Sequence, residues 1–97
     1  MTRIVIKKLV WDAYNVEHIK KHNVTVDEAE EVGKHFISHK KGKNGRYLAV
    51  GRSGSRLISL VVKRKKVGIY YLVTARDSSR KERREIYEKE KYNKEKI

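Results

Sequence analysis

Arginine residues mark the places in this sequence where phosphate chemistry could take place. Arg76 ends an apolar run, and Ser78 and Ser79 follow it at a predicted helix start. A helix N-terminus with free amide groups, next to an arginine, is a suitable site for a phosphate. When RNA is cleaved by its own 2′-hydroxyl group, charge develops on a five-coordinate phosphorus, and a guanidinium fork can bind its oxygens. Arg76 is therefore a candidate phosphate contact, either in a ribonuclease site or in a simple RNA-binding surface.

His18 and His22 are candidates for the proton transfers that such a cleavage needs. They are four residues apart, so in a helix they lie on one face. A neutral pair packed beneath a sheet, a pair that acts in catalysis or contacts RNA, and a pair that shares a metal ion all fit this spacing. A metal would need a third ligand, for which only Glu28 and His39 come into question, so no metal site and no cofactor is predicted.

The charge of the chain points to a polyanionic partner. Its 97 residues contain 25 Lys and Arg against 12 Asp and Glu, which gives a net charge of +13. Residues 38–66 hold ten basic residues and no acidic one, whereas residues 1–37 hold six of each and residues 67–97 hold nine against six. A solubility effect or a disordered tail is the alternative, but the acid-free tract contains strand-like apolar runs.

A nucleic acid is therefore the expected partner. A membrane is not expected, because no basic helix has a large apolar face. The residues predicted to bind RNA are Lys40, Lys41, Lys43, Arg46, Arg52, Arg56, Arg80 and Arg84.

The composition excludes several classes of protein. The chain has no cysteine, which rules out disulfides, cysteine-ligated zinc and a cysteine nucleophile. The longest apolar runs, Leu57–Val62 and Ile69–Val73, are far shorter than the roughly 18 residues of a membrane helix. The first residues lack the apolar segment of a signal peptide. We therefore expect a single cytoplasmic domain over residues 1–97.

Apolar spacing predicts an α+β fold. Asp12 is a helix N-cap candidate, and Thr25 and Glu28 form a capping box for a second helix. Three β-rich runs are joined by short turns and so must pair antiparallel, giving a sheet of three to four strands in the order β-α-α-β-β-β-α. The expected elements are a strand near 4–10, two helices within 12–36, strands over 46–52, 56–63 and 69–76, and a charged helix over about 78–92. The apolar stripe of that last helix is thin: Ile86, Tyr87 and Tyr92.

The last strand predicts where Arg76 points. Ile69, Tyr71 and Val73 alternate and are expected to face the core, which places Arg76 on the opposite face. An ion pair with a carboxylate such as Glu82 is the alternative role for Arg76. In that case the arginine would stabilise the fold rather than a transition state.

Three motifs lie in order over about residues 9–90. They read Trp11-Asp12-x-x-Asn15-x-x-His18-Ile19-x-x-His22-x-Val24-Thr25-x-x-Glu28-x-x-Glu31-Val32, then Arg46-Tyr47-Leu48 with Gly51-Arg52, and then Val73-Thr74-Ala75-Arg76-Asp77 followed by Arg80-x-Glu82-Arg83-Arg84-x-x-Tyr87. In this order and spacing, the motifs resemble the signature of BrnT-like toxins.

This resemblance implies a RelE-like fold and a type II toxin that cleaves RNA without a metal. It also implies a cognate antitoxin, encoded nearby and expected to be acidic, that neutralises the toxin. Two other functions stay open: a non-catalytic module that binds RNA or DNA, and an inactive toxin relic that only binds an antitoxin-like partner. By their matched positions, the catalytic candidates are Arg76, Arg83, Tyr87, His18 and His22.

Overall fold

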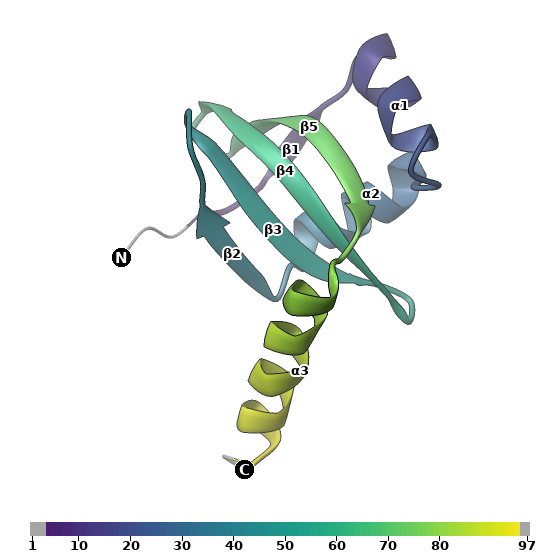
Figure 1. Cartoon of the computed structure of the whole chain (residues 1–97). Coiled ribbons are helices and arrows are strands. Elements are labelled where there is room, and N and C mark those ends of the chain that lie inside the picture. Colours follow the sequence, from purple (N-terminus) through teal and green to yellow (C-terminus); the bar gives the residue numbers. More distant parts are fainter. Residues whose placement is uncertain (1–3, 96–97) are drawn as a thin grey trace.

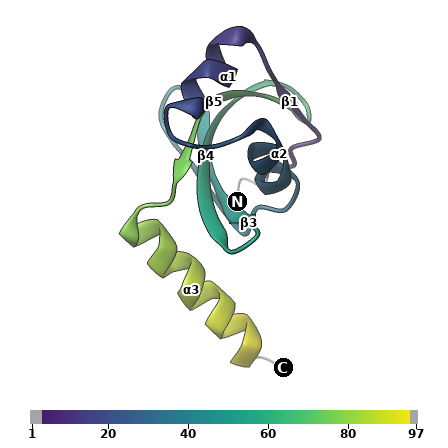
Figure 2. The ribbon, with the colours of Figure 1, turned by 90° about the vertical axis from the view of Figure 1, so that its right-hand side faces the viewer.

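One mixed sheet organises the chain. In this computed structural model, which describes residues 4–95 and the side chains of residues 4–91, five strands lie in the order β1-β5-β4-β3-β2. Helices α1 and α2 cover one face of the sheet, and α3 leaves from the other side (Figure 1 and Figure 2). This arrangement confirms the predicted α+β fold. The elements are β1 (Lys8–Val10), α1 (Ala13–Lys20), α2 (Val26–Lys34), β2 (Ser38–Lys41), β3 (Arg46–Ser53), β4 (Arg56–Lys66), β5 (Ile69–Asp77) and α3 (Arg80–Glu95).

The sheet differs from the prediction in two details. It is not wholly antiparallel, because β1 pairs with β5 in parallel, with Leu9 opposite Tyr70. It also has an additional strand, since Ser38–Lys41, where no strand was predicted, forms β2, which pairs with β3. Asn44 and Gly45, between these two strands, have φ angles of 61° and 72°, a conformation typical of tight hairpin turns. The Asn-Gly pair is thus a hairpin signal that the prediction did not use.

The starts of the first two helices follow from local sequence. Asp12 caps α1 by accepting a hydrogen bond from the Asn15 amide at 2.9 Å, and Thr25 caps α2 in a capping box with Glu28. Asn23, between these helices, has a φ of 58°, as its tolerance of the left-handed region predicts. These contacts join residues only three apart in the chain. They confirm the predicted helix starts.

Asn15 fixes the first helix to the sheet. Its side chain is fully buried, and Nδ2 donates to the Val10 carbonyl at 2.9 Å and to the Leu72 carbonyl at 3.0 Å. Oδ1 accepts from the Asp12 amide at 2.9 Å. The asparagine of the first motif is therefore a structural residue that joins α1 to β1 and β5.

A β-bulge in β5 changes which residues face the core. The partners of Val61 and Val62 are Thr74 and Leu72, so Val73 is an additional residue in β5. A bulge of this kind reverses the alternation of the strand. Tyr70, Leu72 and Ala75 are buried, whereas the residues predicted to be buried, Ile69, Tyr71 and Val73, are only half-buried. That prediction is wrong, but the bulge still leaves Arg76 on the face away from α1 and α2.

Helix α3 packs on the outer face of the sheet through little apolar surface. Ile86 is fully buried and forms a small cluster with Val50 and Leu57. Tyr87 is 53% exposed, so it does not contribute to this cluster as predicted; the side chain of Tyr92 lies outside the described residues. Within residues 4–95, no helix is long and apolar enough to cross a membrane.

Candidate functional site

Arg76 lies at the end of β5, where its guanidinium binds Glu82 of α3. Nη1 donates to Oε1 at 2.9 Å and Nη2 donates to Oε2 at 3.0 Å, which is a bidentate pair. Glu82 also accepts a hydrogen bond from the Ser79 amide at 2.8 Å and so completes the capping box of α3. The ion pair that sequence analysis gave as the alternative role of Arg76 is therefore present.

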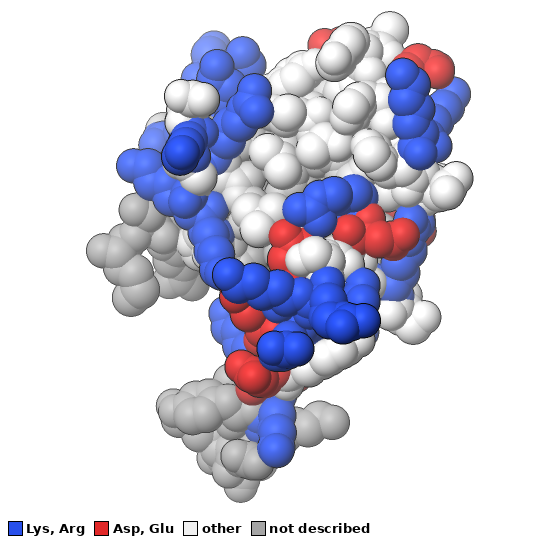
Figure 3. Space-filling view, viewed as in Figure 1, with Lys and Arg blue, Asp and Glu red and all other residues white. Residues whose placement is uncertain are grey.

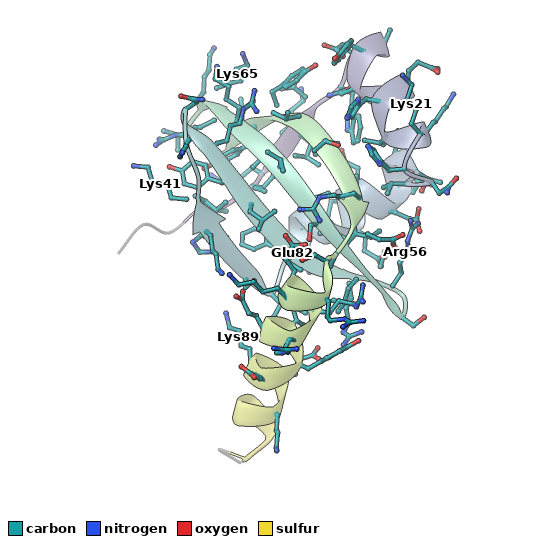
Figure 4. The ribbon with its side chains drawn as sticks, viewed as in Figure 1. Lys21, Lys41, Arg56, Lys65, Glu82 and Lys89 are labelled. Carbon is teal, nitrogen blue, oxygen red and sulfur yellow. The ribbon has the colours of Figure 1, made fainter. Side chains whose placement is uncertain are left out.

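Two buried serines complete this cluster. Ser59 Oγ donates to Glu82 Oε1 at 2.8 Å and lies 2.8 Å from Ser78 Oγ. The hydrogen bonds from Arg76, more than those from the Ser79 amide and the Ser59 hydroxyl, lower the pKa of Glu82 to about 2, although burial opposes this shift. The same pair raises the pKa of Arg76. Glu82 is therefore ionised at neutral pH, at the junction between the sheet and α3 (Figure 4).

The Glu82 carboxylate lies where sequence analysis expected a phosphate. It lies between Arg76 and the first turn of α3, and it accepts hydrogen bonds from the Arg76 guanidinium and the Ser79 amide, the donors that a bound phosphate would need. The Arg76 side chain is nevertheless 37% exposed, so a phosphate could approach the part of the guanidinium that Glu82 does not cover. Glu82 thus holds the guanidinium in one orientation. Such an orienting contact is compatible with either a structural or a catalytic arginine.

Arg56 joins three separate parts of the chain. Its Nε donates to Asp77 Oδ1 at 2.6 Å, and its Nη1 donates to the Asn23 carbonyl at 2.6 Å and to Glu28 Oε2 at 3.1 Å. Its Nη2 is 3.4 Å from the carbonyl of His22. The Arg56 pair lowers the pKa of Asp77, while the Thr25 amide, more than Arg56, lowers that of Glu28. Arg56, predicted to bind RNA, is therefore a structural link between the α1–α2 turn and the end of β5.

Arg52 and Tyr87 form a second contact between the sheet and α3. Arg52 Nε and Nη2 donate to the two carboxylate oxygens of Glu90 at 3.0 and 2.8 Å. The guanidinium carbon of Arg52 lies 5.9 Å from the centre of the Tyr87 ring. Tyr87 is thus placed beside Arg52 of β3, away from the Arg76 pair. Arg83 remains near the start of α3, where its Nη1 donates to the Ser78 carbonyl at 2.6 Å.

The two candidate histidines lie side by side, His18 on α1 and His22 in the turn that follows this helix. The His18 and His22 rings are 5.3 Å apart, edge to face, and Tyr14 stacks on His18 at 6.1 Å. Among the described side chains, neither histidine forms a hydrogen bond with an arginine of β5 or α3. The backbone of His22 is linked to Asp77, next to Arg76, only through Arg56. In the described part of the chain, no three His, Asp or Glu side chains gather in a way that could hold a metal ion.

Three of the other predicted cations, Lys41, Lys43 and Arg46, lie at the opposite end of the sheet, together with cations of β4 that were not predicted. The β2–β3 turn and the β4–β5 turn lie side by side there, because Arg46 pairs with Lys63 in the ladder. All seven cations of this end have exposed side chains, and within residues 4–91 none has an ion-pair partner. Figure 3 shows an uncharged stretch over the middle of the sheet between the basic residues of this end and those near α3, whereas along one edge of the sheet basic residues continue from one group to the other. We call this group the lysine end: Lys41, Lys43, Arg46, Lys63, Arg64, Lys65 and Lys66.

By contrast, cations at the other end of the sheet are largely paired. We call this group the arginine end: Arg52, Arg56 and Arg76, with their partners Glu28, Asp77, Glu82 and Glu90. Lys40, a predicted RNA-binding residue, is also paired, with Glu85 at 2.8 Å. Arg80 and Arg84 are exposed on α3 and have no ion pair in the described part of the chain.

Sequence reasoning did not identify Ser59 as part of this site. A signal was present, since Ser59 is a polar residue within the otherwise apolar run from Leu57 to Val62. A polar side chain in the middle of a buried strand needs a hydrogen-bond partner. The Glu82 carboxylate and the Ser78 hydroxyl supply it.

Similarity to a solved structure agrees with the motif resemblance. The ribonuclease toxin BrnT of Brucella abortus superposes on this chain with a TM-score of 0.59 and 26% sequence identity, over 75% of this chain and 97% of BrnT. The chain has a BrnT-like fold. Nearly the whole of BrnT is matched, so the similarity extends over most of that protein rather than a single motif. No protein-family model matches the chain, and no curated protein matches it in sequence.

Proposed function

We propose that this protein is the toxin of a type II toxin–antitoxin pair and cleaves RNA without a metal ion. The similarity to BrnT, a ribonuclease toxin, is the observation that carries this proposal. The site adds a second support, because Arg76 presents an oriented and partly exposed guanidinium beside the start of α3. A fixed guanidinium of this kind can stabilise the charge of a phosphate transition state.

In the proposed reaction, the 2′-oxygen of a ribose attacks the neighbouring phosphorus and displaces the 5′-oxygen of the next nucleotide. Arg76 binds the phosphate oxygens while negative charge develops on them. Arg80, Arg83 and Tyr87 follow Arg76 along the chain, and each lies about one helical turn from the next. In this proposal, a strand of RNA bound at Arg76 passes over these three side chains. The proton leaves the 2′-oxygen and another reaches the departing 5′-oxygen.

We assign the proton transfers to His18, His22 and Tyr87. The imidazole group is the side chain that most readily exchanges a proton near neutral pH. His22 lies in the α1–α2 turn that Arg56 links to Asp77, which makes it the histidine whose backbone is joined most directly to the Arg76 strand. Each of the three groups would have to reach the RNA, since none of them contacts Arg76 itself.

An acidic antitoxin is the proposed protein partner. The net charge of +13 and the unpaired cations of the lysine end favour an acidic surface, and encounter with such a partner would be accelerated by electrostatic attraction. Expression together with the product of the neighbouring short reading frame tests this assignment. A protein that purifies alone at low salt after such co-expression would argue against it.

Cleavage of RNA by the purified protein in the presence of EDTA tests the proposed activity. We expect cleavage that persists in EDTA and that stops when the antitoxin is added in equal amount. Induced expression in a bacterium should arrest growth and fragment RNA, and co-expression of the antitoxin should restore growth. RNA that stays intact in all of these assays would contradict the proposed activity.

A non-catalytic RNA-binding module is the second candidate function. The specific observation in its favour is that Glu82 already occupies the bidentate face of Arg76. In that case the protein would bind RNA in EDTA without cleaving it, and Arg76→Ala would change stability more than RNA affinity.

A further inference from the structure

We infer that the lysine end is a separate binding site for the RNA backbone, remote from the cleavage site. This inference rests on the proposed function, and it adds the cations at positions 63–66 to the residues predicted from sequence. The site would bind phosphate groups of single-stranded RNA upstream or downstream of the scissile bond. It would not take part in the bond cleavage.

The absence of carboxylates from the lysine end is the first reason. An unpaired cation that binds a phosphate displaces a counterion from the RNA, and the release of that counterion favours binding. A cation already paired with a carboxylate contributes less, because it must give up or share that partner. In the described part of the chain, the exposed lysines at this end have no acidic partner, while Arg52, Arg56 and Arg76 each have one or two. Most of the electrostatic affinity for RNA should therefore come from the lysine end.

The convergence of two hairpin turns is the second reason. Arg46 lies opposite Lys63 in the β3–β4 ladder, and Gly42 and Arg46 close the β2–β3 turn with a hydrogen bond of 2.8 Å. Lys41 and Lys65, from the two hairpins, both lie at this end in Figure 4. Rigid hairpins from neighbouring strands hold the cations close together, which a flexible basic tail would not do. The surface thus provides several phosphate contacts for one strand.

The distance to Arg76 separates binding from catalysis. Ser59 lies opposite Arg76, and Lys65 is six residues further along β4, which is roughly 20 Å at about 3.3 Å per residue. This separation is more than twice the Debye length of about 8 Å at physiological salt. The lysine end should therefore affect the binding of RNA rather than the charge at the scissile phosphate. A stacked strand advances roughly 3.4 Å per nucleotide, so RNA must extend about six nucleotides from the scissile bond to reach it.

The decisive measurement is RNA affinity of a charge variant and its matched control. The variant is Lys63→Gln, Lys65→Gln and Lys66→Gln in one chain. The control is Lys21→Gln, Lys34→Gln and Lys91→Gln, three exposed lysines away from the lysine end that have no ion pair among the described side chains. The probe is a 20-nucleotide RNA with 2′-O-methyl groups, which cannot be cleaved, followed by fluorescence anisotropy in EDTA over a series of salt concentrations. Thermal melting checks that both variants fold.

We expect the lysine-end variant to bind about tenfold more weakly at low salt, with a salt slope less steep by about 2, at about 0.7 per phosphate contact. The control should change both quantities much less. Equal effects of the two variants would overturn the inference, because they would show that only net charge matters. An unchanged RNA affinity together with weaker antitoxin binding would also overturn it and would assign the surface to the protein partner.

Cleavage kinetics separate this inference from the proposed function. With unmodified RNA, the lysine-end variant should raise KM about tenfold for a 20-nucleotide substrate and have little effect for a substrate too short to span the two ends. If neither parent nor variant cleaves RNA but the affinities differ as expected, the proposed function fails and the binding site stands. If the parent cleaves RNA and KM is the same for parent and variant, the binding site fails and the proposed function stands.

Discussion

Both ends of the sheet carry cations, but the surroundings of these cations differ. At the arginine end, Arg76 shares a bidentate pair with Glu82, and Arg52 shares one with Glu90. At the lysine end, Lys63 and Lys65 of β4 are exposed and have no ion pair among the described residues, and the Lys65 ammonium lies 5.7 Å from the centre of the Tyr71 ring. A cation can therefore hold the fold together or be free for a ligand, and the composition of the chain does not distinguish the two.

This contrast shows the limit of reading charge along a sequence. Arg52 and Arg56 belong to a tract without acidic residues, yet their partners Glu90, Glu28 and Asp77 come from outside that tract. A tract of one sign in the sequence thus becomes a mixed surface at one end of the fold. Only the part of the tract at the two hairpin turns keeps its unpaired charge.

The largest expected effect distinguishes an arginine of each end. Arg76→Ala should lower kcat 10²-fold or more, about 3 kcal/mol of transition-state stabilisation, whereas Arg46→Ala at the lysine end should act mainly on KM. Arg76→Lys should not restore the rate, because an ammonium group cannot reproduce the planar fork. Cleavage rates in EDTA at saturating RNA measure both effects.

The Arg76 experiment needs a control for folding, because removal of Arg76 leaves the mostly buried Glu82 carboxylate unpaired. The double variant Arg76→Ala, Glu82→Gln removes this charge and should recover much of the lost thermal stability. It should not recover the rate. A double variant that cleaves RNA at the parental rate would show that Arg76 only balances Glu82.

The second prediction concerns how α3 stays attached at the arginine end. Ile86 is the apolar side chain of α3 that is fully buried against the sheet, so Ile86→Ala should lower the free energy of unfolding by about 2–3 kcal/mol. Amide exchange in α3 should accelerate more than exchange in the lysine-end hairpins. Glu88→Ala, at an exposed position of the same helix, serves as the stability control. A loss below about 1 kcal/mol for Ile86→Ala would show that the polar contacts alone hold the helix.

Local signals account for the parts of the fold that could be predicted. The three helix caps depend on residues three apart, so Asp12, Thr25 and Ser79 could be recognised directly from the sequence. The face of β5 could not be predicted, because both alternating sets of that strand are apolar and the bulge at Val73 depends on pairing with β4. Strand β2 is polar, so no apolar pattern in the sequence indicated a strand there.

The candidate site was predictable in its residues but not in its contacts. Arg76 and Glu82 are six apart and could be named as a pair, since both lie at one strand-to-helix junction. The partners of Arg56, by contrast, are 28 and 21 residues away and meet it only after the sheet and the α1–α2 turn have formed. No spacing rule indicates such contacts. The separation of the histidines from Arg76 has the same origin, because it depends on how α1 packs on β5.

The third prediction uses pH to loosen the arginine end alone. Glu82 has a pKa of about 2 in the folded protein against an ordinary value of 4.5, so the unfolded chain takes up the proton first as the pH falls. The stability that Glu82 contributes is therefore complete above pH 4.5 and is lost between about pH 4.5 and 2. Allowing for the partial exposure of Arg76, this loss amounts to about 2 kcal/mol.

Urea denaturation of the parent and of Glu82→Gln between pH 7 and 3 measures this loss. The variant should be less stable at pH 7, and the difference between the two proteins should narrow as the pH falls. Glu88→Gln, at an exposed position of α3, should follow the parent. A difference between parent and Glu82→Gln that stays constant down to pH 3 would contradict the assignment of the acid-sensitive stability to Glu82.

The smallest expected effect compares two neighbouring lysines. Lys40 is paired with Glu85 at 2.8 Å, whereas Lys41, the next residue of β2, belongs to the unpaired lysine end. Lys41→Gln should therefore weaken binding of the 2′-O-methyl RNA by about threefold at low salt, roughly the effect of one phosphate contact, and Lys40→Gln should weaken it less. Both variants lose the same formal charge, so a difference between them reports pairing rather than net charge. An exposed ion pair contributes about 0–1 kcal/mol to folding, so both proteins should melt near the parental temperature. If Lys40→Gln weakens RNA binding as much as Lys41→Gln, pairing with a carboxylate does not decide which cations bind RNA, and the division of the sheet into two ends loses its meaning for function.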